Sequence, residues 1–498
     1  MQDSEYRLVI IYSVSALGLY LLFLCLRFRS WLSKLASVVR VPLLRYLVYP
    51  TIYAEWSWAD ILASAAYLAL NILCLWFQCP SLSDAGRRAG YLALITMVFP
   101  FSAWHLDSLT GLLGLRWRSV RRLHGLTGTM ASLLLLFHAT TAQISSTSFP
   151  MDTSDNRGAV IAASAIGGLV LFSVPTIKDN LYEIFIRLHQ GMAILSIYGI
   201  WEHLAAQSVF ARLLLYVSVG ASALSLLLLS GLVIYRNGLL FHGFPRTSIS
   251  NSGDVIIIEL RLSRPVFVDA GKSISLWMLT PSAKLRSLWQ THPFVVASWS
   301  ASPADTLHLL VEPRSGLTEK LLQFSKMQKV QQTCPALFGG PHGMSVPVTD
   351  YDVVLMVASG YGIAAQLPYL KKLIYEFNSR KARTRRIHLV WTLDTIELAV
   401  AIKHLLDSAL REDTLDDGYI LKISIFVRHI SQGHDISPRA TIAKGAPDFN
   451  AIIREEVEGK YIRRVQDNEK GRESMIVLGK PAPQPARALS HSHSIGLD

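Results

Sequence analysis

The pattern of hydrophobic and polar positions divides the chain near residue 236. Before that point, apolar runs of about 20 residues recur, which is the length an α-helix needs to cross a bilayer. Seven spans are predicted, at 7–27, 58–77, 91–113, 122–143, 158–177, 183–204 and 211–235. The third is the weakest because Pro100, His105 and Asp107 interrupt it. For His105 we expect an ordinary polar or interfacial role.

After Arg236 the pattern becomes that of short strands. Runs rich in β-branched and aromatic residues, such as DVIIIELRLS and HPFVVASW, predict a small antiparallel barrel over 237–347. Over 348–498, strands alternate with helices, as in YDVVLMVAS followed by AAQLPYLKKLIYEF, which predicts a doubly wound parallel sheet. Within it we expect a polar, irregular insertion at 431–470 and a mobile C-terminal tail.

Composition and charge favour a membrane half joined to a soluble half. Hydrophobic residues make up 51% of the 498 residues, and the net charge is +12. The basic residues cluster at span ends: Arg27, Arg29, Lys34, Arg40 and Arg45 follow the first run, and Arg116, Arg118, Arg121 and Arg122 precede the fourth. Such clusters mark the cytoplasmic side. We therefore expect lipid rather than nucleic acid as a partner.

The same clusters predict the topology. They place the C-terminal half in the cytosol and the N-terminus outside, with 1–57 forming a retained span and a basic cytosolic loop and 58–236 forming a membrane domain. The arginines of the predicted loop QCPSLSDAGRR disagree with this orientation. The four cysteines include no CxxC pair, so neither a disulfide framework nor a thiolate metal site is indicated.

Two predicted spans carry histidines at the same spacing. His124 and His138 lie fourteen residues apart in one, and His189 and His203 lie fourteen residues apart in the other. This spacing is only about 40° short of four helical turns and rises by about 21 Å, so each pair shares one helix face. One span separates the two helices, so they run in the same direction. The first histidines then face each other at one depth and the second at another.

Facing imidazoles in a helical bundle are the usual axial ligands of a six-coordinate haem. The sequence therefore predicts two haems stacked across the bilayer, with Gly125, Gly128 and Gly191 leaving room beside them. A lone histidine in a span can instead hydrogen-bond a neighbouring helix. The repeated spacing favours the ligand interpretation.

The soluble half carries a series of nucleotide-binding patterns. In HPFVVASW, Phe294 can pack near a flavin ring and Ser298 can hydrogen-bond near its reactive edge, although this motif alone favours an ordinary strand. RSGLTEKLL places backbone N–H groups at a helix start, where they bind a pyrophosphate. GGPHG forms a turn, and VASGYGIAAQLPYL reads as strand, glycine turn and helix. The predicted cofactor contacts are His292, Pro293, Phe294, Ser298, Gly316, Leu317, Thr318, Gly340, Gly343, Gly360, Gly362 and Ile363.

Taken together, these motifs resemble the fungal ferric reductase family, within the ferric reductase and NADPH oxidase superfamily. LTGL before the first histidine helix, the two His-x13-His helices and HPFVVAS are similar to the family's patterns, with Val295 where threonine is usual. GGPHG resembles the GPYG turn with His342 for tyrosine. GYGI resembles GGxGI, with Ser359 replacing one glycine.

The resemblance implies a chain of electron carriers. Cytosolic NADPH would reduce FAD, and electrons would pass to an inner haem on His124 and His189, then to an outer haem on His138 and His203. An Fe(III) chelate on the opposite face would accept them, in iron acquisition or metal homeostasis at the plasma membrane. A superoxide-producing NADPH oxidase is an alternative. So is a specialised-metabolism redox protein or haem-bearing scaffold with an impaired dehydrogenase half.

Departures from the family pattern support that last alternative. The family's last strand usually ends in CGP, whereas here MIVLGKP places Leu478 where cysteine is expected. Leu478 can also merely complete a strand. No signal for a 2′-phosphate is visible, so NADPH rests on the resemblance and NADH stays possible. Asp394 suits a ribose diol, but we favour it as the N-cap of the following helix, with Glu397 at N3.

Overall fold

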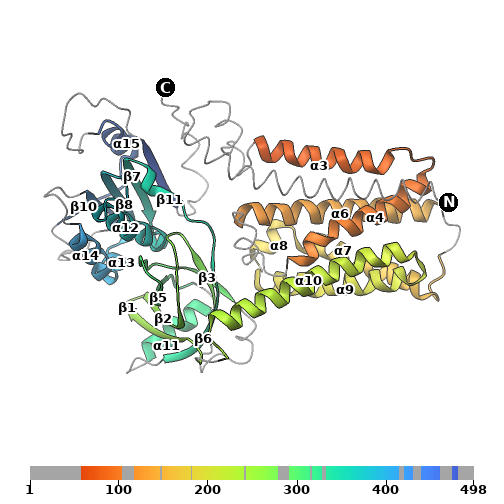
Figure 1. Ribbon diagram of the computed structural model, residues 1–498, viewed down its shortest axis with the longest axis horizontal. Helices are drawn as coiled ribbons and strands as arrows, with labels where there is room; N and C mark the ends of the chain where they lie inside the picture. The colour runs from red at the N-terminus through yellow and green to blue at the C-terminus, as the bar shows by residue number, and fades with distance from the viewer. Residues whose placement is uncertain are drawn as a thin grey trace. The chain divides into compact units, whose positions relative to one another are not determined.

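The computed structural model describes residues 58–103, 117–145, 149–180, 182–240, 243–278, 291–314, 317–327, 333–413, 420–429, 439–459 and 474–480. The predicted first span, His105, Gly316 and the C-terminal tail lie outside these residues. The chain forms two compact units, Met1–Gly231 and Leu232–Asp498. The first is helical, and the second contains two sheets (Figure 1).

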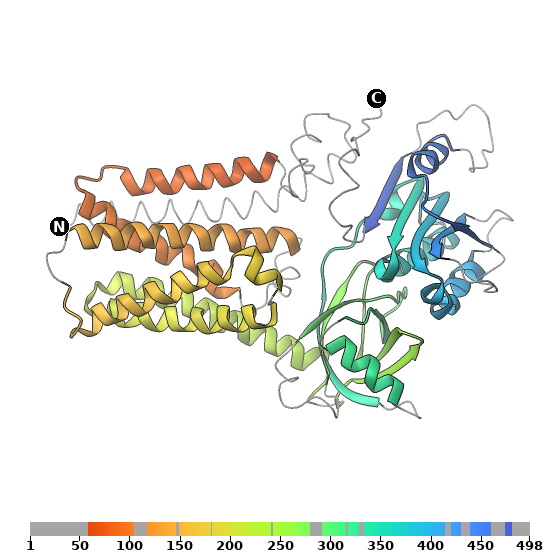
Figure 2. The ribbon, with the colours of Figure 1, turned by 180° about the vertical axis from the view of Figure 1, so that it is seen from behind.

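Long helices lying side by side build the first unit, as views from the front and from behind both show (Figures 1 and 2). α4 packs along α6, and α7 packs along α9. The helices are α3 (Trp58–Trp76), α4 (Leu82–Ser102), α6 (Trp117–Ser145), α7 (Ser154–Phe172), α8 (Pro175–Asn180), α9 (Tyr182–His203) and α10 (Val209–Arg236), with a 3-10 turn η1 (Leu204–Ala206) before α10.

Five of these helices, α3, α6, α7, α9 and α10, lie where spans are predicted, but α4 differs. It begins at Leu82 rather than at 91, so only residues 78–81 of the predicted loop QCPSLSDAGRR are a loop and the prediction is wrong for 82–88. Ser81 caps the helix by accepting a hydrogen bond from the Asp84 N–H. Arg88 is buried and donates to the carbonyls of Cys74, Leu75 and Phe77 at the end of α3. Arg88 thus lies at the C-terminus of α3, where the helix dipole favours a positive charge.

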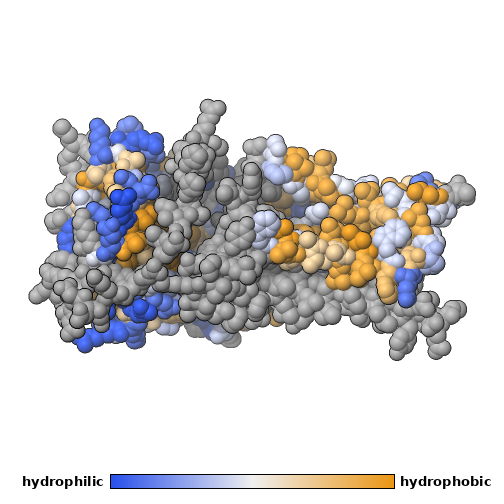
Figure 3. Space-filling view, turned by 90° about the horizontal axis from the view of Figure 1, so that it is seen from above, coloured by the Kyte–Doolittle hydropathy of each residue, from blue (hydrophilic) through white to orange (hydrophobic). Residues whose placement is uncertain are grey.

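The outer surface of the helical unit is apolar. Among the described residues, Ile184–Ala206 and Val209–Arg236 are long and apolar enough to cross a membrane, and Asp60–Trp76 is a shorter apolar helix. Leu227 on α10 is 70% exposed, and Leu62 on α3 is 58% exposed. Such residues gather over this unit in the space-filling view (Figure 3). Exposed apolar surface on this scale fits lipid as its surroundings.

The second unit begins with an antiparallel six-stranded sheet in the order β4-β3-β6-β1-β2-β5. A bridge between Val296 and Leu309 joins the β4 edge to the β5 edge, so the sheet closes on itself around an apolar core. Its elements are β1 (Arg246–Ser252), β2 (Val255–Val266), β3 (Ser273–Met278), β4 (His292–Val295), β5 (Ala304–Val311), α11 (Leu317–Met327) and β6 (Thr333–His342).

A parallel five-stranded sheet follows, in the order β10-β9-β8-β7-β11. The order reverses between β7 and β11, which is where doubly wound sheets bind nucleotides. Its elements are η3 (Val348–Asp350), β7 (Val353–Ser359), η4 (Gly360–Gly362), α12 (Ile363–Asn378), β8 (Arg386–Thr395), α13 (Glu397–Ala401), α14 (Lys403–Glu412), β9 (Leu421–His429), β10 (Ala440–Lys444), α15 (Phe449–Val457) and β11 (Met475–Lys480).

The predicted irregular insertion at 431–470 is therefore wrong in its middle part. Ala440–Lys444 pairs in parallel with β9 as the edge strand β10, and α15 follows it. Asp448 caps α15 by accepting from the N–H groups of Asn450 and Ala451. A short, half-buried edge strand with a lysine lacks the hydrophobic run by which strands are found in a sequence.

Polar contacts connect the two sheets of the second unit. Lys372 on α12 lies 2.8 Å from the Asp269 carboxylate, which precedes β3. The Tyr369 hydroxyl, also on α12, accepts a hydrogen bond of 2.9 Å from the Val346 N–H. A Cβ at Gly271 would lie 2.2 Å from that hydroxyl, and Gly271 has φ +80°. These contacts hold α12, and with it the β7 turn, against the first sheet.

Candidate cofactor sites

The four histidines of the helical unit form two facing pairs. The rings of His124 on α6 and His189 on α9 have centroids 6.0 Å apart, at an interplanar angle of 53°. The rings of His138 and His203, further along the same helices, have centroids 6.2 Å apart at 66°. The pairing predicted from the spacing is thus the pairing found.

These separations match the requirements of an iron between two imidazoles. A metal–imidazole nitrogen bond is about 2 Å, and the ring centroid lies about 1 Å behind the nitrogen, so two axial imidazoles have centroids about 6 Å apart. Imidazoles that hydrogen-bonded each other directly would lie closer. The donor chemistry and both separations therefore fit a bis-histidine haem at each pair.

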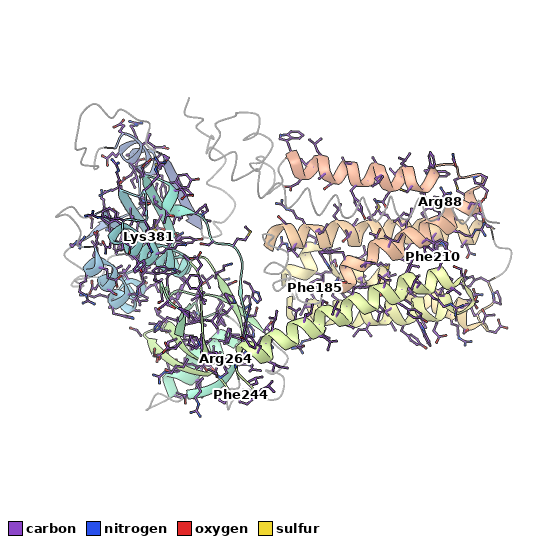
Figure 4. All side chains as sticks on the ribbon, viewed as in Figure 1. Arg88, Phe185, Phe210, Phe244, Arg264 and Lys381 are labelled. Carbon is purple, nitrogen blue, oxygen red and sulfur yellow. The ribbon has the colours of Figure 1, made fainter. Side chains whose placement is uncertain are left out.

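The surroundings of the pairs also leave space for a flat macrocycle. A Cβ built on Gly125, Gly128 or Gly191 meets no atom within 4 Å. The Nδ1 atoms of His124 and His189 are buried with no hydrogen-bond partner among the described residues. Buried polar atoms without partners are rare. Phe185, whose ring centroid lies 5.3 Å from that of His189, and Arg88 lie toward opposite ends of this unit (Figure 4).

In the second unit, two of the predicted flavin motifs lie on either side of β3. β4 carries His292, Pro293 and Phe294 and pairs with β3, so that Val295 lies opposite Ser273. On the other edge of β3, His342 at the end of β6 lies opposite the same Ser273. The HPFV strand and the GGPHG turn, distant in sequence, are thereby brought to one end of three adjacent strands.

Individual side chains of these motifs have clear local roles. Phe294 packs half-buried against the core of the first sheet. The Ser298 hydroxyl accepts a hydrogen bond of 3.1 Å from the His308 N–H on β5, and it keeps its own proton for a further acceptor. Pro293 is exposed, and His342 is buried in place of the family's tyrosine.

The glycines of the GGPHG turn are required by its backbone. Gly340 has φ +114° and Gly343 has φ +90°, in the region that favours glycine. A Cβ on Gly340 would lie 3.1 Å from the Ser273 carbonyl. The Arg236 guanidinium donates to the Gly340 carbonyl, and the Lys272 ammonium donates to the Gly343 carbonyl. Two cations thus lie beside this turn, where a flavin's pyrophosphate would benefit from them.

The predicted pyrophosphate-binding helix is present. α11 begins at Leu317, and the Thr318 hydroxyl accepts from the Arg314 N–H at 2.8 Å. The hydroxyl therefore fixes the chain entering the helix. Gly316, which precedes it, is outside the described residues.

The nicotinamide turn follows the prediction of strand, glycine turn and helix. β7 ends at Ser359, Gly360–Gly362 forms a 3-10 turn, and the buried Ile363 begins α12. Gly360 has φ +48°, and a Cβ there meets no atom within 4 Å, so the backbone is open to a close ligand. The Trp391 indole N–H donates to the Gly360 carbonyl at 2.9 Å. Burial, with the carboxylates of Glu312 and Asp254, raises the pKa of Tyr361 to about 12.

Leu478 is a strand residue whose side chain packs on the core. It lies on β11 opposite Met356 of β7, half-buried against the apolar residues of the parallel sheet. Lys480 pairs with Ala358, so the carboxyl end of β11 lies beside the glycine turn. The place of the missing cysteine is therefore next to the predicted nicotinamide site.

The capping interpretation of Asp394 is wrong. β8 runs through Asp394 to Thr395, α13 begins at Glu397, and no side-chain cap bond is present at its N-cap Ile396. The exposed Asp394 carboxylate instead pairs with Arg428 at 3.1 Å. Asp394 lies near the carboxyl end of β8, which adjoins β7, and Arg428 lies near that of β9, the next strand in the sheet. A nucleotide's ribose binds at this edge of doubly wound sheets. Sequence reasoning missed Arg428 because its partner lies on another strand.

Three families match successive parts of the chain. The ferric reductase like transmembrane component matches residues 89–200, an FAD-binding domain matches 242–346, and the ferric reductase NAD binding domain matches 351–474. The matches define the class: a transmembrane component followed by FAD- and NAD-binding reductase domains. The chain belongs to the ferric reductase family, as its motifs predict.

Curated relatives of this family come from fungi. The ferric reductase transmembrane component 3 of Saccharomyces cerevisiae is 28% identical over 43% of this chain and 29% of its own length. Component 5 of the same yeast is 24% identical over 59% of this chain and 42% of its own. The probable cell surface ferric reductase kap2 of Aspergillus oryzae is 30% identical over 22% and 16%. The chain thus spans less than half the length of the relatives it matches.

Solved structures with some likeness are flavin and nicotinamide proteins. A flavohemoglobin from Malassezia yamatoensis is 14% identical with a TM-score of 0.32, covering 80% of this chain and all of its own. The CS-b5R domains of human Ncb5or are 13% identical with a TM-score of 0.32, covering 47% and 61%. At these scores the likeness decides nothing about fold or function.

Proposed function

We propose that the chain is a transmembrane ferric-chelate reductase that oxidises cytosolic NADPH and reduces an Fe(III) chelate on the opposite face. The observation that carries the proposal is the pair of facing imidazole pairs, each with ring centroids about 6 Å apart as bis-histidine iron requires. The relatives named ferric reductase add the class of acceptor. Iron acquisition and a plasma-membrane location belong to the same proposal.

The helical unit would hold two b-type haems. His124 and His189 would ligate one, and His138 and His203 the other. Gly125, Gly128 and Gly191 would leave space for the macrocycles. When bound, FAD converts a hydride into single electrons and the haem irons carry single electrons across the bundle. The helices set the separation of the two sites and exclude water from them.

The second unit would bind the flavin and the nicotinamide. Phe294 and Ser298 would contact the flavin ring, while Arg236, Lys272 and the start of α11 would neutralise its pyrophosphate. The open backbone at Gly360 would accept the second nucleotide, with the neutral Tyr361 phenol, whose pKa is raised by burial, beside its phosphates. Asp394 and Arg428 would lie near its adenosine ribose.

The helix order supports a direction of flow. α9 and α10 are joined by the short 3-10 turn η1 and run in opposite directions (Figures 1 and 2), so α10 ends toward the end of the bundle where α9 begins. His189 lies near the beginning of α9 and His203 at its end. The chain leaves the bundle from α10, so the pair of His124 and His189 would be the inner one and the pair of His138 and His203 the outer one.

An acceptor assay in membranes tests the function. Membranes containing the chain are given NADPH or NADH, and Fe(III) chelate reduction is measured beside superoxide release. We expect chelate reduction coupled to NADPH oxidation, and its loss in His138→Ala, which removes the outer site. Superoxide as the main product would replace the proposal by an NADPH oxidase. NADPH consumption absent with every acceptor, despite bound haem, would replace it by an impaired scaffold, which Leu478 favours.

A further inference from the structure

The two histidine pairs differ in what their second ring nitrogen contacts. The His138 Nδ1 lies 2.8 Å from the Gly86 carbonyl oxygen on α4. The His203 Nδ1 lies 3.1 Å from the Asp155 carbonyl oxygen on α7. The Nδ1 atoms of His124 and His189 have no such partner among the described residues. Within the described part of the chain, one pair therefore has two backbone acceptors and the other pair has none.

A carbonyl oxygen only accepts, so each contact fixes the tautomer. Nδ1 must carry the proton in both His138 and His203, which leaves Nε2 as the nitrogen free to ligate iron. Donation from Nδ1–H also increases the electron density on the ring and makes it a stronger ligand. A stronger ligand stabilises the more highly charged ferric state.

Glycines make these contacts possible by letting the backing helices approach. A Cβ on Gly86 would lie 1.9 Å from the Thr141 hydroxyl, and one on Gly90 would lie 3.1 Å from the His138 Nδ1. On the other side, a Cβ on Gly158 of α7 would lie 2.5 Å from the His203 backbone nitrogen. Each of His138 and His203 thus contacts a neighbouring helix. That helix can come so close because it has glycine, which lacks a side chain, at the point of contact.

From this arrangement we propose that the carbonyls of Gly86 and Asp155 are positioning groups that make the two haem sites unequal. The inference rests on the proposed function, because it needs a haem at each pair. The haem held by His138 and His203 has the lower midpoint potential of the two. It is then the stronger reductant, at the end of the bundle where the acceptor is reduced.

Single-haem variants test the order of potentials. His189→Ala leaves the haem of the His138 and His203 pair, and His203→Ala leaves the other. Each is purified, and its midpoint potential is measured by spectroelectrochemical titration, which does not depend on activity. We expect the lower potential in His189→Ala. Equal potentials, or the reverse order, would overturn the inference.

Two glycine variants on α7 test whether the backbone carbonyl contact causes the difference in potential. Gly158→Ala forces α7 away from His203 and lengthens the Asp155 contact, so the potential of that haem should rise while its spectrum stays low-spin. Gly167→Ala is the matched control, because its Cβ meets no atom within 4 Å, and it should shift neither haem. A shift from neither variant, or the same shift from both, would overturn the role of the carbonyls.

These experiments distinguish a failure of the positioning role from a failure of the proposed reductase function. A wild-type chain without haem would refute both. Two low-spin haems with equal potentials would refute only the positioning role. If Gly158→Ala fails to fold, the order of potentials in the single-haem variants still decides.

Discussion

Histidines of the two units have opposite environments. In the helical unit, the imidazoles face each other with ring centroids 6.0 and 6.2 Å apart, as two axial ligands of one metal would. In the second unit, His388 on β8 is also buried, but its Nε2 lies 2.9 Å from the Ser424 hydroxyl and its Nδ1 lies 2.7 Å from the Glu456 carboxylate. Both of its nitrogens thus lie within 3 Å of a polar protein atom, although the Nδ1 contact lacks the geometry of a hydrogen bond. A buried imidazole is a candidate ligand only where the protein leaves a nitrogen available.

The protonation states of His388 and Glu456 agree with this difference between the two units. Burial lowers the pKa of His388, although the Glu456 carboxylate beside it acts in the other direction. Burial raises the pKa of Glu456, but the contacts with His388 and Arg386 outweigh this and hold it below its usual value. The cluster is therefore a neutral imidazole with an ionised carboxylate and a guanidinium. It attaches α15 to the sheet and needs no cofactor.

Replacing one histidine from each environment gives the largest contrast. His189→Ala should remove one of the two haems and leave flavin binding unchanged. His388→Ala should leave both haems and destabilise the second unit by about 2 kcal/mol, through lost packing and hydrogen bonds. Haem content by pyridine haemochrome and thermal unfolding measure the two effects. Loss of haem in His388→Ala would contradict the distinction between haem-ligating histidines and the structural His388.

Removing the carboxylate of the buried cluster should be the largest change in stability. Glu456→Ala leaves the buried Arg386 without the partner 3.3 Å away, so we expect about 3–5 kcal/mol of destabilisation. Asp394→Ala is the control, because its pair with Arg428 is exposed and should contribute less than about 1 kcal/mol. Denaturant unfolding decides, and similar losses in both variants would contradict the buried role of Glu456.

The flavin assignment predicts a defect confined to the second unit. Ser298→Ala removes the proton that can reach the flavin and the acceptor for the His308 N–H, so FAD affinity should fall by roughly tenfold. The haem spectrum should not change. Ser300→Ala serves as the control, since the Ser300 hydroxyl contacts the nearby Ser302. Fluorescence of released flavin measures the affinity, and an unchanged value for Ser298→Ala would remove it from the site.

Arg428 tests the choice of nicotinamide. If its guanidinium binds a 2′-phosphate, Arg428→Ala should weaken NADPH by roughly tenfold with little effect on NADH. The ratio of the two Michaelis constants for flavin reduction is the measurement. Arg411→Ala, at the end of α14, is a control for lost surface charge. An unchanged ratio would mean that Arg428 does not bind the 2′-phosphate and only forms a surface ion pair with Asp394.

The smallest expected effect concerns Leu478. Leu478→Cys makes a half-buried side chain smaller, so stability should change by about 1 kcal/mol. The thiol would lie on β11 beside the glycine turn, and flavin reduction by NADPH should become faster in stopped flow. Ile476→Cys on the same strand is the matched control. An unchanged rapid rate would mean that this chain does not need the cysteine.

The sequence predicted those parts of the fold that repeat a simple period. Hydropathy located α3, α6, α7, α9 and α10, and the fourteen-residue spacing predicted which histidines face each other. The start of α4 was missed because its polar residues interrupt the hydropathy, although Ser81 and Asp84 form a capping pattern that was visible. The Asp394 cap was wrong because β8 continues further than its hydrophobic run.

Contacts between distant segments could not be predicted in this way. The carbonyls of Gly86 and Asp155 carry no sequence signal, because every residue has a backbone carbonyl and only the packing of α4 and α7 selects these two. The Asp394–Arg428 pair depends on two strands lying side by side. The polar edge strand β10 likewise follows from the sheet it joins rather than from its own residues.

The number and spin state of bound haems test the central claim most directly. The full chain, purified in detergent, is examined for haem per polypeptide and for its optical and low-temperature electron paramagnetic resonance spectra. The account predicts two b-type haems per chain, both six-coordinate and low-spin, since each pair of imidazoles supplies both axial ligands. A chain with no haem, or with high-spin haem open on one side, would contradict it.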